Sequence, residues 1–483
     1  MNIQERQSLL SKTYYYNDND FNDYNEFNKD NDYNDYNELK NYNNYNQGKI
    51  KKYCCFKKIK RCLKYSCIGF GIISFIFFVA TLIFYIISIN FQTHISYSNN
   101  YSTNNINVMW GSLLNYDHKE VTLFKNGIDI KTYNNTITYR YLTNHILPSY
   151  THKVEFQDLD YDTNYNYQIK MGPYKSKQFN FKTEPKLNDE LNIILYGDMG
   201  AFRADTLKFI IDDVQTKKYN FIFHMGDLAY DLESFWGIVG NLFLSKIQTI
   251  SSMIPYMTIP GNHESNNNFS QYINRFNMPE YSTSKSLFYT LNFPPLKMIN
   301  INTEAFYYPS LDESKIYMID YVENQIKNIN RTIYPWVIAT GHRPMYCTNS
   351  DKDDCSNWIR DRVRSQFESL FLKYKLNIFL AAHEHSYERT CPLYNGSCQQ
   401  NISNNSVYFY DELQYPINII SGAAGCVEGS NPFSSSKPIW SLVRSINDGY
   451  GTLFVNKSHL SWTEYSIDNN KKTIIDTFSI IKK

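Results

Sequence analysis

The chain has 483 residues, with 48 Lys and Arg against 47 Asp and Glu, and 42% of its residues are hydrophobic. At roughly 150 residues per domain, this length predicts two or three folded units with cores of their own. The formal net charge of +1 argues against a protein that binds nucleic acid by neutralising phosphates. The hydrophobic content excludes a chain that is disordered throughout.

Residues 1–66 predict a polar cytoplasmic tail. Residues 1–48 are largely Asn, Asp and Tyr, with almost no aliphatic side chain between Lys12 and Leu39. Such a stretch buries too little apolar surface to offset its ordering entropy, so we expect it to be disordered. A basic juxtamembrane block follows between Lys49 and Lys64. Residues 5–10 (ERQSLL) resemble an acidic dileucine signal, which implies a sorting adaptor as partner and an endosome- or lysosome-like destination.

Residues 67–89 predict a transmembrane signal-anchor helix. This run has 23 residues without a charge, and at about 1.5 Å per residue it spans a hydrocarbon core of roughly 30 Å. It is apolar on every face and follows a long polar segment, which fits neither a buried core helix nor a cleaved signal peptide. Because the basic block lies on its N-terminal side, residues after Asn90 are expected in the lumen or outside the cell. The sequence thus predicts a single-pass type II membrane protein of an endosome- or lysosome-like compartment or the cell surface.

Cysteines and glycosylation sequons agree with this topology. Four cysteines at the membrane edge suit S-palmitoylation better than disulfides: Cys54, Cys55, Cys62 and Cys67. Beyond the anchor, the pairs Cys347/Cys355 and Cys391/Cys398 could close short loops, which would leave Cys426 unpaired. Sequons that would make the ectodomain a glycoprotein begin at Asn100, Asn134, Asn268, Asn330, Asn395, Asn401, Asn404 and Asn456.

Residues 93–183 predict an all-β N-terminal domain. Short runs of alternating polarity, such as KEVTLFKNG and YNYQIKMG, are separated by Asn, Gly and Asp and indicate an antiparallel β-sandwich. Residues 159–167 (LDYDTNYNY) resemble the tyrosine-corner segment of fibronectin type III modules. No group of titratable residues stands out here, so we expect a packing or positioning role.

Residues 190–465 predict a layered α/β domain that carries the chemistry, and residues 466–483 are expected to be a C-terminal extension. Several apolar runs end in side chains that can bind a metal, and segments with helical spacing lie between the runs. The carboxyl ends of strands gather at one edge of such a domain, so we expect these side chains to meet in one site. They are Asp198, Asp227, Tyr230, Asn262, His263, His342, His383 and His385.

The motifs in this region resemble the calcineurin-like metallophosphoesterases. They are GDMG at 197–200, GDLAY at 226–230, GNHE at 261–264, GH at 341–342 and HEH at 383–385. Within this superfamily the chain resembles the purple acid phosphatases, because Tyr230 stands three residues after the second Asp of the motifs. The resemblance is strongest to the animal-type branch, in the segments GHRPMYCTN, AHEHSYER and IISGAAGC. The resemblance covers nearly everything after the anchor. It implies a layered β-sandwich flanked by helices, preceded by the fibronectin III-like domain.

The resemblance also implies a dinuclear metal centre. The first metal would be held by Asp198, Tyr230 and His385, the second by Asn262, His342 and His383, and Asp227 would bridge both. The first group has three anionic oxygens once the phenol is ionised, and only a highly charged ion removes a proton with a pKa of about 10, which favours Fe(III). The second group suits a divalent ion such as Fe, Zn or Mn.

The function implied is that of a membrane-anchored acid phosphatase. Two metal ions roughly 3.5–4 Å apart lower the pKa of bound water and clamp a phosphate, so hydroxide attacks a phosphate monoester in line. A trivalent ion acidifies water more strongly than a divalent one, which suits an acidic compartment.

Two positions depart from the family pattern. Ala382 stands where Gly usually precedes the His-x-His, which costs little unless that backbone is left-handed. No second histidine follows His342 before Cys355, so the acid that protonates the leaving group stays open. His263, beside Asn262, is the candidate for substrate binding and proton donation, or it only orients the loop. Arg343 either contacts the phosphate or forms a structural ion pair.

Two other functions remain as alternatives. One is a phosphodiesterase or nucleotide-processing ectoenzyme of the same fold, against which Tyr230 argues. The other is a catalytically inactive binding module, which the presence of all seven expected ligands disfavours.

Overall fold

The computed structural model describes residues 74–75, 78–79, 91–99, 104–143, 147–186, 190–350, 355, 357–399 and 406–483. Residues 1–80 form one unit and residues 81–483 another, and all strands belong to the second. The predicted tail, the sorting signal, the four membrane-edge cysteines and most of the predicted span 67–89 lie outside the described residues. Within the part that the structure describes, no helix is long and apolar enough to cross a membrane.

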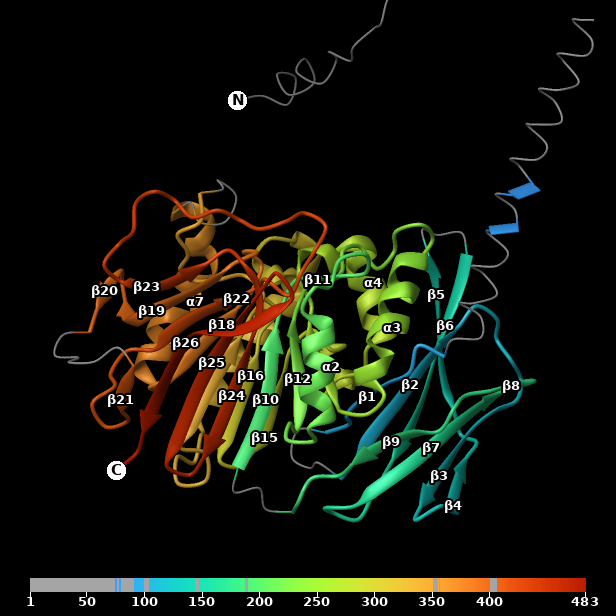
Figure 1. Ribbon diagram of the computed structural model, residues 1–483. Helices are drawn as coiled ribbons and strands as arrows, with labels where there is room; N and C mark the ends of the chain where they lie inside the picture. Colours follow the sequence, from blue (N-terminus) through green and yellow to red (C-terminus); the bar gives the residue numbers. More distant parts are fainter. Residues whose placement is uncertain are drawn as a thin grey trace, which may run out of the picture. The chain divides into compact units, whose positions relative to one another are not determined.

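Residues 94–182 form two antiparallel sheets that share one core (Figure 1). Phe156 of one sheet has its ring centroid 4.9 Å from that of Tyr133 and 6.0 Å from that of Tyr167 in the other. The first sheet has the order β1 (His94–Tyr97), β2 (Ile106–Ser112), β6 (Leu147–Phe156), β5 (Ile137–Thr143). The second has the order β4 (Ile128–Tyr133), β3 (Lys119–Lys125), β7 (Asn164–Met171), β8 (Tyr174–Lys175), with β9 (Phe179–Lys182) beside β7.

The remaining residues build a second domain around two larger sheets. The first sheet has seven strands, and β10, β12 and β14 in it are parallel. Its order is β14 (Tyr256–Ile259), β12 (Phe221–Met225), β10 (Glu190–Tyr196), β24 (Asp448–Asn456), β25 (His459–Asp468), β26 (Lys471–Ile481), β21 (Val407–Phe409). A small parallel pair, β11 (Met199–Gly200) and β13 (Leu228–Ala229), lies beyond its carboxyl edge.

The second large sheet has eight strands with a parallel centre formed by β16, β17, β18 and β22. Its order is β15 (Tyr289–Phe293), β16 (Leu296–Asn300), β17 (Trp336–Thr340), β18 (Ile378–Ala381), β22 (Ile417–Ser421), β19 (Tyr387–Tyr394), β20 (Ser397–Cys398), with β23 (Ser441–Ser445) beside β19. The parallel strands are buried along their whole length, as expected for strands covered on both faces.

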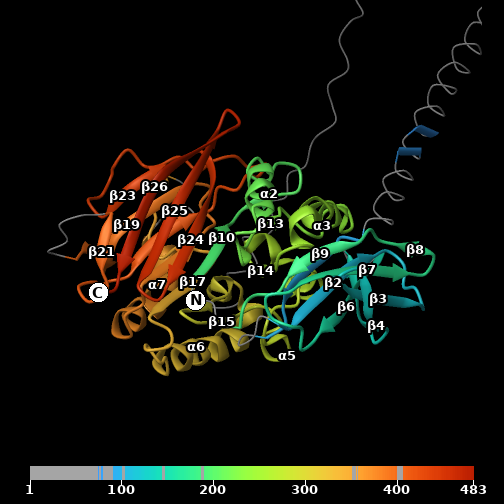
Figure 2. The same ribbon diagram turned by 60° about the horizontal axis from the view of Figure 1, so that its bottom comes forward.

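Helices cover the two large sheets, with α2 and α3 beside the first and α6 and α7 beside the second (Figures 1 and 2). The helices are α2 (Leu207–Gln215), α3 (Ile238–Ser251), α4 (Asn266–Arg275), α5 (Tyr281–Ser284), α6 (Asp312–Lys327) and α7 (Asn357–Lys373), with 3-10 turns at Asn262–Glu264, Thr303–Phe306 and Pro309–Leu311. The helical spacing in the sequence is matched by α2, which buries Leu207, Ile210 and Val214. The predicted layered α/β domain is therefore confirmed.

The apolar runs singled out in the sequence are strands β10, β12, β14, β17 and β18. Three belong to the first large sheet and two to the second, and both sets are parallel. Their carboxyl ends therefore meet at one edge of the two-sheet stack, where the loops bearing the candidate site begin.

The expected C-terminal extension at 466–483 is wrong, because these residues complete the first large sheet. The boundary at 465 falls inside β25, and β26 pairs with β25 along its length. Asp476 of β26 accepts hydrogen bonds from Arg389 at 2.5 and 2.9 Å and from the Tyr387 hydroxyl at 2.6 Å. Since both donors lie on β19, this buried carboxylate ties the last strand to the second large sheet. The apolar alternation of β26 is interrupted by the buried Asp476, so the sequence pattern does not mark β26 as a core strand.

The two faces of β26 supply a matched stability test. Phe478 is 1% exposed and packs against Tyr408, whereas Ile474 on the same strand is 61% exposed. We expect Phe478→Ala to lower the free energy of unfolding by about 3–5 kcal/mol. Ile474→Ala should change it by less than about 0.5 kcal/mol. Denaturant unfolding of both variants measures the change in the free energy of unfolding. Equally small changes in the two variants would mean that residues 466–483 form a loosely attached extension.

Candidate metal centre

The loops that carry the candidate ligands have an unusual backbone. Asp198, Asp227, Tyr230 and His383 have φ of 63°, 54°, 60° and 70°, in the left-handed region that non-glycine residues seldom occupy. Each such residue costs about 1–3 kcal/mol, and this strain tends to gather at functional sites. The loops also approach closely, since a Cβ at Gly261 would lie 2.2 Å from Asp227 Oδ1. Glycine is therefore required at 261.

Asp198, Tyr230 and His385 form one group of side chains. The Tyr230 hydroxyl lies 2.6 Å from His385 Nε2 and donates to Asp198 Oδ1 at 3.3 Å. His385 Nε2 is 3.6 Å from the same carboxylate oxygen. Because His385 Nδ1 lies 2.8 Å from the Gly429 carbonyl, that nitrogen carries the proton and Nε2 faces the group with its lone pair.

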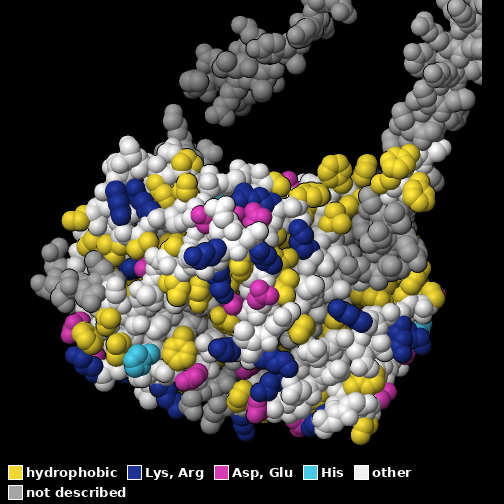
Figure 3. Space-filling view, in the orientation of Figure 1, with side chains coloured by type: hydrophobic (Ala, Val, Ile, Leu, Met, Phe, Trp, Pro, Cys, Tyr) yellow, Lys and Arg dark blue, Asp and Glu magenta, His cyan; other side chains and the backbone are white. Residues whose placement is uncertain are grey.

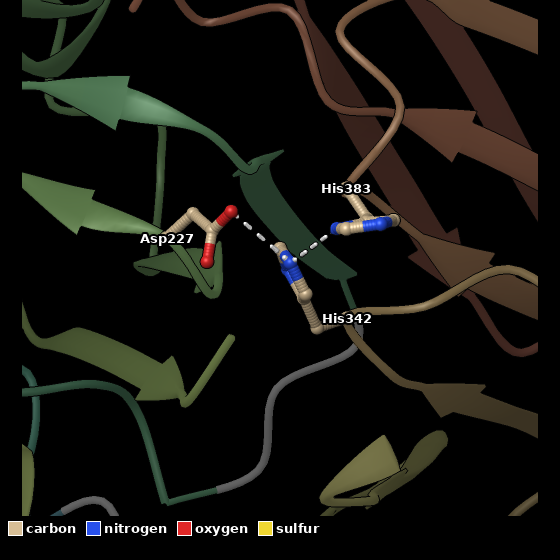
Figure 4. Close-up of side chains that lie close together, drawn as sticks. All are labelled: Asp227, His342 and His383. Carbon is tan, nitrogen blue, oxygen red and sulfur yellow. Dashed lines mark hydrogen bonds and ion pairs between the residues drawn. The ribbon is translucent and has the colours of Figure 1, made fainter. Parts of the chain in front are cut away.

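Asn262, His342 and His383 form a second group. Figure 4 shows Asp227 beside His342 and His383. His342 Nε2 is 3.1 Å from Asn262 Oδ1, 3.1 Å from His383 Nδ1 and 3.3 Å from Asp227 Oδ2. His342 Nδ1 donates to the Met225 carbonyl at 2.8 Å, which leaves the Nε2 lone pair for a ligand. Asp227, His342 and His383 bring their ligand atoms within 4.8 Å of one another.

Asp227 also lies electrostatically close to the first group. Burial raises the pKa of both Asp198 and Tyr230, and the charge of Asp227 raises both further. As anions, two buried carboxylates and a phenolate would repel one another, so these groups keep protons unless a cation joins them. This donor set of hard oxygens and imidazole nitrogens fits a pair of hard metal ions. The seven side chains meet as expected, while their assignment as ligands stays a prediction.

His263 lies among three acidic side chains, of which the sequence analysis singled out Asp227 but not Asp231 or Glu428. Its Nδ1 is 2.8 Å from Asp231 Oδ1, and its Nε2 is 3.6 Å from Glu428 Oε1 and 3.9 Å from Asp227 Oδ2. Burial lowers the pKa of His263, but the bond to Asp231 and the charge of Asp227 outweigh it and raise the pKa to about 9. The neighbouring carboxylates therefore favour the protonated form of the ring.

Arg343 takes part in a structural ion pair. Its Nε donates to Glu304 Oε1 and Oε2 at 2.9 and 3.0 Å, and its guanidinium lies 4.1 Å from the ring centroid of Tyr307. Its Nη1 is 3.1 Å from His383 Nε2, on the side of that ring away from His342. The side chain is 11% exposed. The sequence allowed Arg343 either to contact the phosphate or to form a structural ion pair, and the structure contains the ion pair with Glu304.

Glu264, the last residue of the GNHE motif, supports the candidate site in a way to which the sequence analysis gave no role. Its buried carboxylate accepts the backbone N–H of Asp227 and Leu228, each at 2.9 Å, and that of Gly261 at 2.8 Å. It thereby joins the loops after β12 and β14. Burial and the charge of Asp227 raise the pKa of Glu264 to about 8. Its place directly after the Gly-Asn-His motif was the signal that could have found it.

The structure answers two questions that the sequence left open, namely which cysteines pair and whether the backbone at Ala382 is left-handed. Cys347–Cys355 and Cys391–Cys398 are disulfides, and Cys426 is a free, buried cysteine whose Sγ lies 3.4 Å from His385 Nδ1. Ala382 is absent from the left-handed residues, and the positive φ belongs to His383 instead. Alanine is therefore tolerated at 382. Its neighbour Gly197 must stay small, because a Cβ there would lie 2.3 Å from Ala382 Cβ.

Two family models match the chain. Residues 191–387 match the calcineurin-like phosphoesterase model, and residues 415–477 match the model for iron/zinc purple acid phosphatase-like protein C. Acid phosphatase type 7 of Danio rerio is 34% identical over 69% of this chain and 78% of its own length, and that of Homo sapiens is 32% identical over 68% and 77%. The chain belongs to the purple acid phosphatase family.

A solved structure shares the same fold. The purple acid phosphatase PPD1 from yellow lupin (Lupinus luteus) seeds superposes with a TM-score of 0.69 at 20% identity, over 81% of this chain and 74% of that one. The chain is accordingly a purple acid phosphatase-type metallophosphoesterase, a member of a family of metal-dependent hydrolases with dinuclear centres. The C-terminal match extends beyond residue 465, in agreement with β25 and β26 as parts of the domain.

Glu264 yields a test of the support for the metal centre. Glu264→Ala leaves three buried N–H groups without an acceptor and loosens the loops that carry Asp227 and Asn262. We expect about a 10- to 100-fold loss of metal affinity, the usual effect of removing a supporting contact. Titration of metal-free protein with Zn²⁺ measures it, and Glu313→Ala on the exposed side of α6 is the control. Equal affinity in the two variants would mean that Glu264 does not support the site.

Proposed function

We propose that this purple acid phosphatase is a membrane-anchored enzyme that hydrolyses phosphate monoesters at a centre of Fe(III) and a divalent metal, which is Fe, Zn or Mn. The observation that carries the proposal is the convergence of seven side chains from five strand ends into two adjoining groups beside Asp227. An oxygen-rich group with a phenol next to a histidine- and amide-rich group matches the chemistry of a trivalent and a divalent ion.

The residues that would hold the metals divide by charge. Asp198, Tyr230 and His385 would hold Fe(III), whose charge is what the buried phenol needs to lose its proton. Asn262, His342 and His383 would hold the divalent ion, and Asp227 would be shared. When bound, such a pair activates water and neutralises charge on the phosphate.

The residues at the mouth would bind the substrate and manage its proton. His263, protonated and held at Nδ1 by Asp231, directs Nε2 toward the cluster and is the proton donor to the leaving group. Asn262 and His263 contact the phosphate together. Arg343 acts as a positioning residue, because Glu304 fixes the guanidinium that touches His383.

Asp227 supplies the test of this function. Asp227→Ala removes the carboxylate between the two groups, so we expect turnover of an aryl phosphate to fall about a thousandfold or more. Metal content by mass spectrometry should fall from two ions per chain, one of them iron. Asp212→Ala, an exposed position on α2, is the control. Undiminished turnover in Asp227→Ala would sink the two-metal proposal.

We further propose that residues 93–483 face the lumen or the outside of the cell. Two disulfides support an oxidising compartment, and the sequon residues Asn134, Asn330 and Asn395 are exposed. The fibronectin III-like assignment of residues 93–183 is supported by Tyr165, whose hydroxyl accepts the backbone N–H of Asp160 at 3.0 Å. This is the backward hydrogen bond of a tyrosine corner.

Topology can be tested with protease on sealed vesicles containing the full chain. An epitope in residues 1–48 should be digested while the residues after 93 stay protected, because the basic block orients the anchor. Detergent should then expose the remainder, which controls for intrinsic resistance. Protection of the epitope before detergent is added would reverse the proposed orientation.

A further inference from the structure

A cavity of about 400 Å³ lies at the amino ends of β17 and β18. Its walls come from the ends of α6 and α7, the turns that follow these helices and the segment that follows β21. Its volume falls in the range of small-molecule sites, which is roughly 300–1,000 Å³. We call it the basic cavity, because Lys327, Arg331, Lys373 and Lys375 lie in its wall.

The basic cavity is separated from the candidate metal centre by the length of two strands. Arg331 donates to the carbonyl of Pro335, directly before β17, and His342 follows the other end of that strand. Asn377 lines the cavity directly before β18, and His383 follows that strand. Five residues of β17 at roughly 3.3 Å each put about 16 Å between the two places. The cavity is therefore not part of the site described above.

The wall of the cavity concentrates positive charge. Among the described residues that line it, the four cations face a single carboxylate, that of Asp411. None of the four cations forms an ion pair with a carboxylate in the described part of the chain. Elsewhere charges are mixed, and Figure 3 shows Lys and Arg interspersed with Asp and Glu over one face of the molecule. Since the whole chain has a formal charge of +1, the cavity is a local excess of cations.

Helix ends explain only part of this charge. Lys327 and Lys373 lie in the last turns of α6 and α7, where a cation interacts favourably with the helix dipole. Arg331 and Lys375 lie beyond the helices, where this effect fades. Lys375 also has a φ of 54°, at a position after a helix that usually holds glycine. A lysine is thus kept there in spite of an unfavourable backbone conformation.

Arg331 fixes the wall of the cavity without losing its charge. Its Nη2 donates to the carbonyls of Tyr374 and Lys375 at 2.5 and 2.9 Å, which joins the turn after α6 to the turn after α7. Carbonyl acceptors are neutral, so they do not cancel the charge of the guanidinium. A further cation lies close by, because Lys482 Nζ is 5.5 Å from the ring centroid of Tyr410 on the opposite segment of the wall.

We propose that the basic cavity binds a small ligand that carries two or more linked phosphate groups. Because the cations come from two helix ends and two turns, linked phosphates reach more of them than a single phosphate does. Lysine binds phosphate as a compact point charge, and arginine binds it through paired N–H groups. The ligand relieves the repulsion among cations that have no carboxylate partner in the described part of the chain. This site is separate from the metal centre and does not depend on the proposed function.

Lysine footprinting on the metal-loaded full chain locates the ligand. Methylenediphosphonate is the probe, because phosphatases do not cleave its P–C bonds, and methylphosphonate is the comparison with one phosphonate. We expect saturating methylenediphosphonate to slow acetylation of Lys327, Lys373 and Lys375 about tenfold, and methylphosphonate at equal ionic strength to slow it less. N-linked glycans are removed first, because the sequon residue Asn330 adjoins Arg331. Mass spectrometry of peptides measures each rate.

Two double variants with the same change in net charge measure the contribution of the wall. In Lys373→Gln/Lys375→Gln, the methylenediphosphonate concentration that half-protects Lys327 should rise about tenfold. In the control Lys217→Gln/Lys218→Gln, after the end of α2 and outside the basic cavity, it should equal that of the wild type. All four substituted lysines are exposed, so neither variant removes a core contact.

The inference is overturned if methylphosphonate protects the three lysines as well as methylenediphosphonate does, or if Lys217 and Lys218 are protected equally. An equal rise of the half-protecting concentration in both double variants would also overturn it, because net charge alone would then explain binding. Asp227→Ala should keep the protection, and its loss there would assign the probe to the metal centre instead. Protection that persists in an Asp227→Ala chain with undiminished turnover would overturn the proposed function alone.

Discussion

The candidate centre depends on the mutual repulsion of buried oxygen donors. Asp198 and Asp227 are at most 1% exposed, and Tyr230 is 7% exposed. In a medium of low dielectric, two carboxylates and an ionisable phenol cannot share such a volume as anions without cations between them. Their left-handed backbone conformations add a conformational cost to the electrostatic one. Metal ions bound between these side chains would remove the electrostatic repulsion and offset the strain of the left-handed backbone.

The sheets supply the rigidity that this arrangement requires. Parallel strands of two separate sheets end at the same edge, and each candidate ligand stands two to five residues beyond its strand. The loops are then tied to one another by acceptors that are themselves buried, such as Glu264 across the loops after β12 and β14. A histidine ring can be fixed by a hydrogen bond from the nitrogen that faces away from the candidate centre. The Met225 carbonyl fixes His342 in this way by accepting from Nδ1. The candidate ligands are therefore held both by buried side chains such as Glu264 and by main-chain acceptors such as the Met225 carbonyl of β12.

The sequence predicted those parts that rest on local pattern. Buried strands that end in Asp198, Asp227 or His342 were recognisable because an apolar run and a polar terminus are adjacent in sequence. The strand β26 and the contacts of Glu264, Asp231 and Glu428 were not recognisable, since each depends on partners far along the chain. For Arg343, pattern left two roles open, and only the position of Glu304 in three dimensions distinguished them. Long-range pairing is thus where prediction from one sequence failed.

The same contrast explains why motifs identify chemistry more readily than substrates. The candidate metal ligands come from short motifs with fixed spacing, whereas the exposed apolar residues Phe235 and Trp236 lie on a loop that carries no motif of its own. Phe235 and Trp236 are ordinary apolar residues in the sequence, and only their exposure and left-handed backbone distinguish them from core residues. A side chain that selects the leaving group must reach beyond the buried centre into solvent. A preference among leaving groups is therefore harder to recognise in the sequence than metal-binding chemistry is.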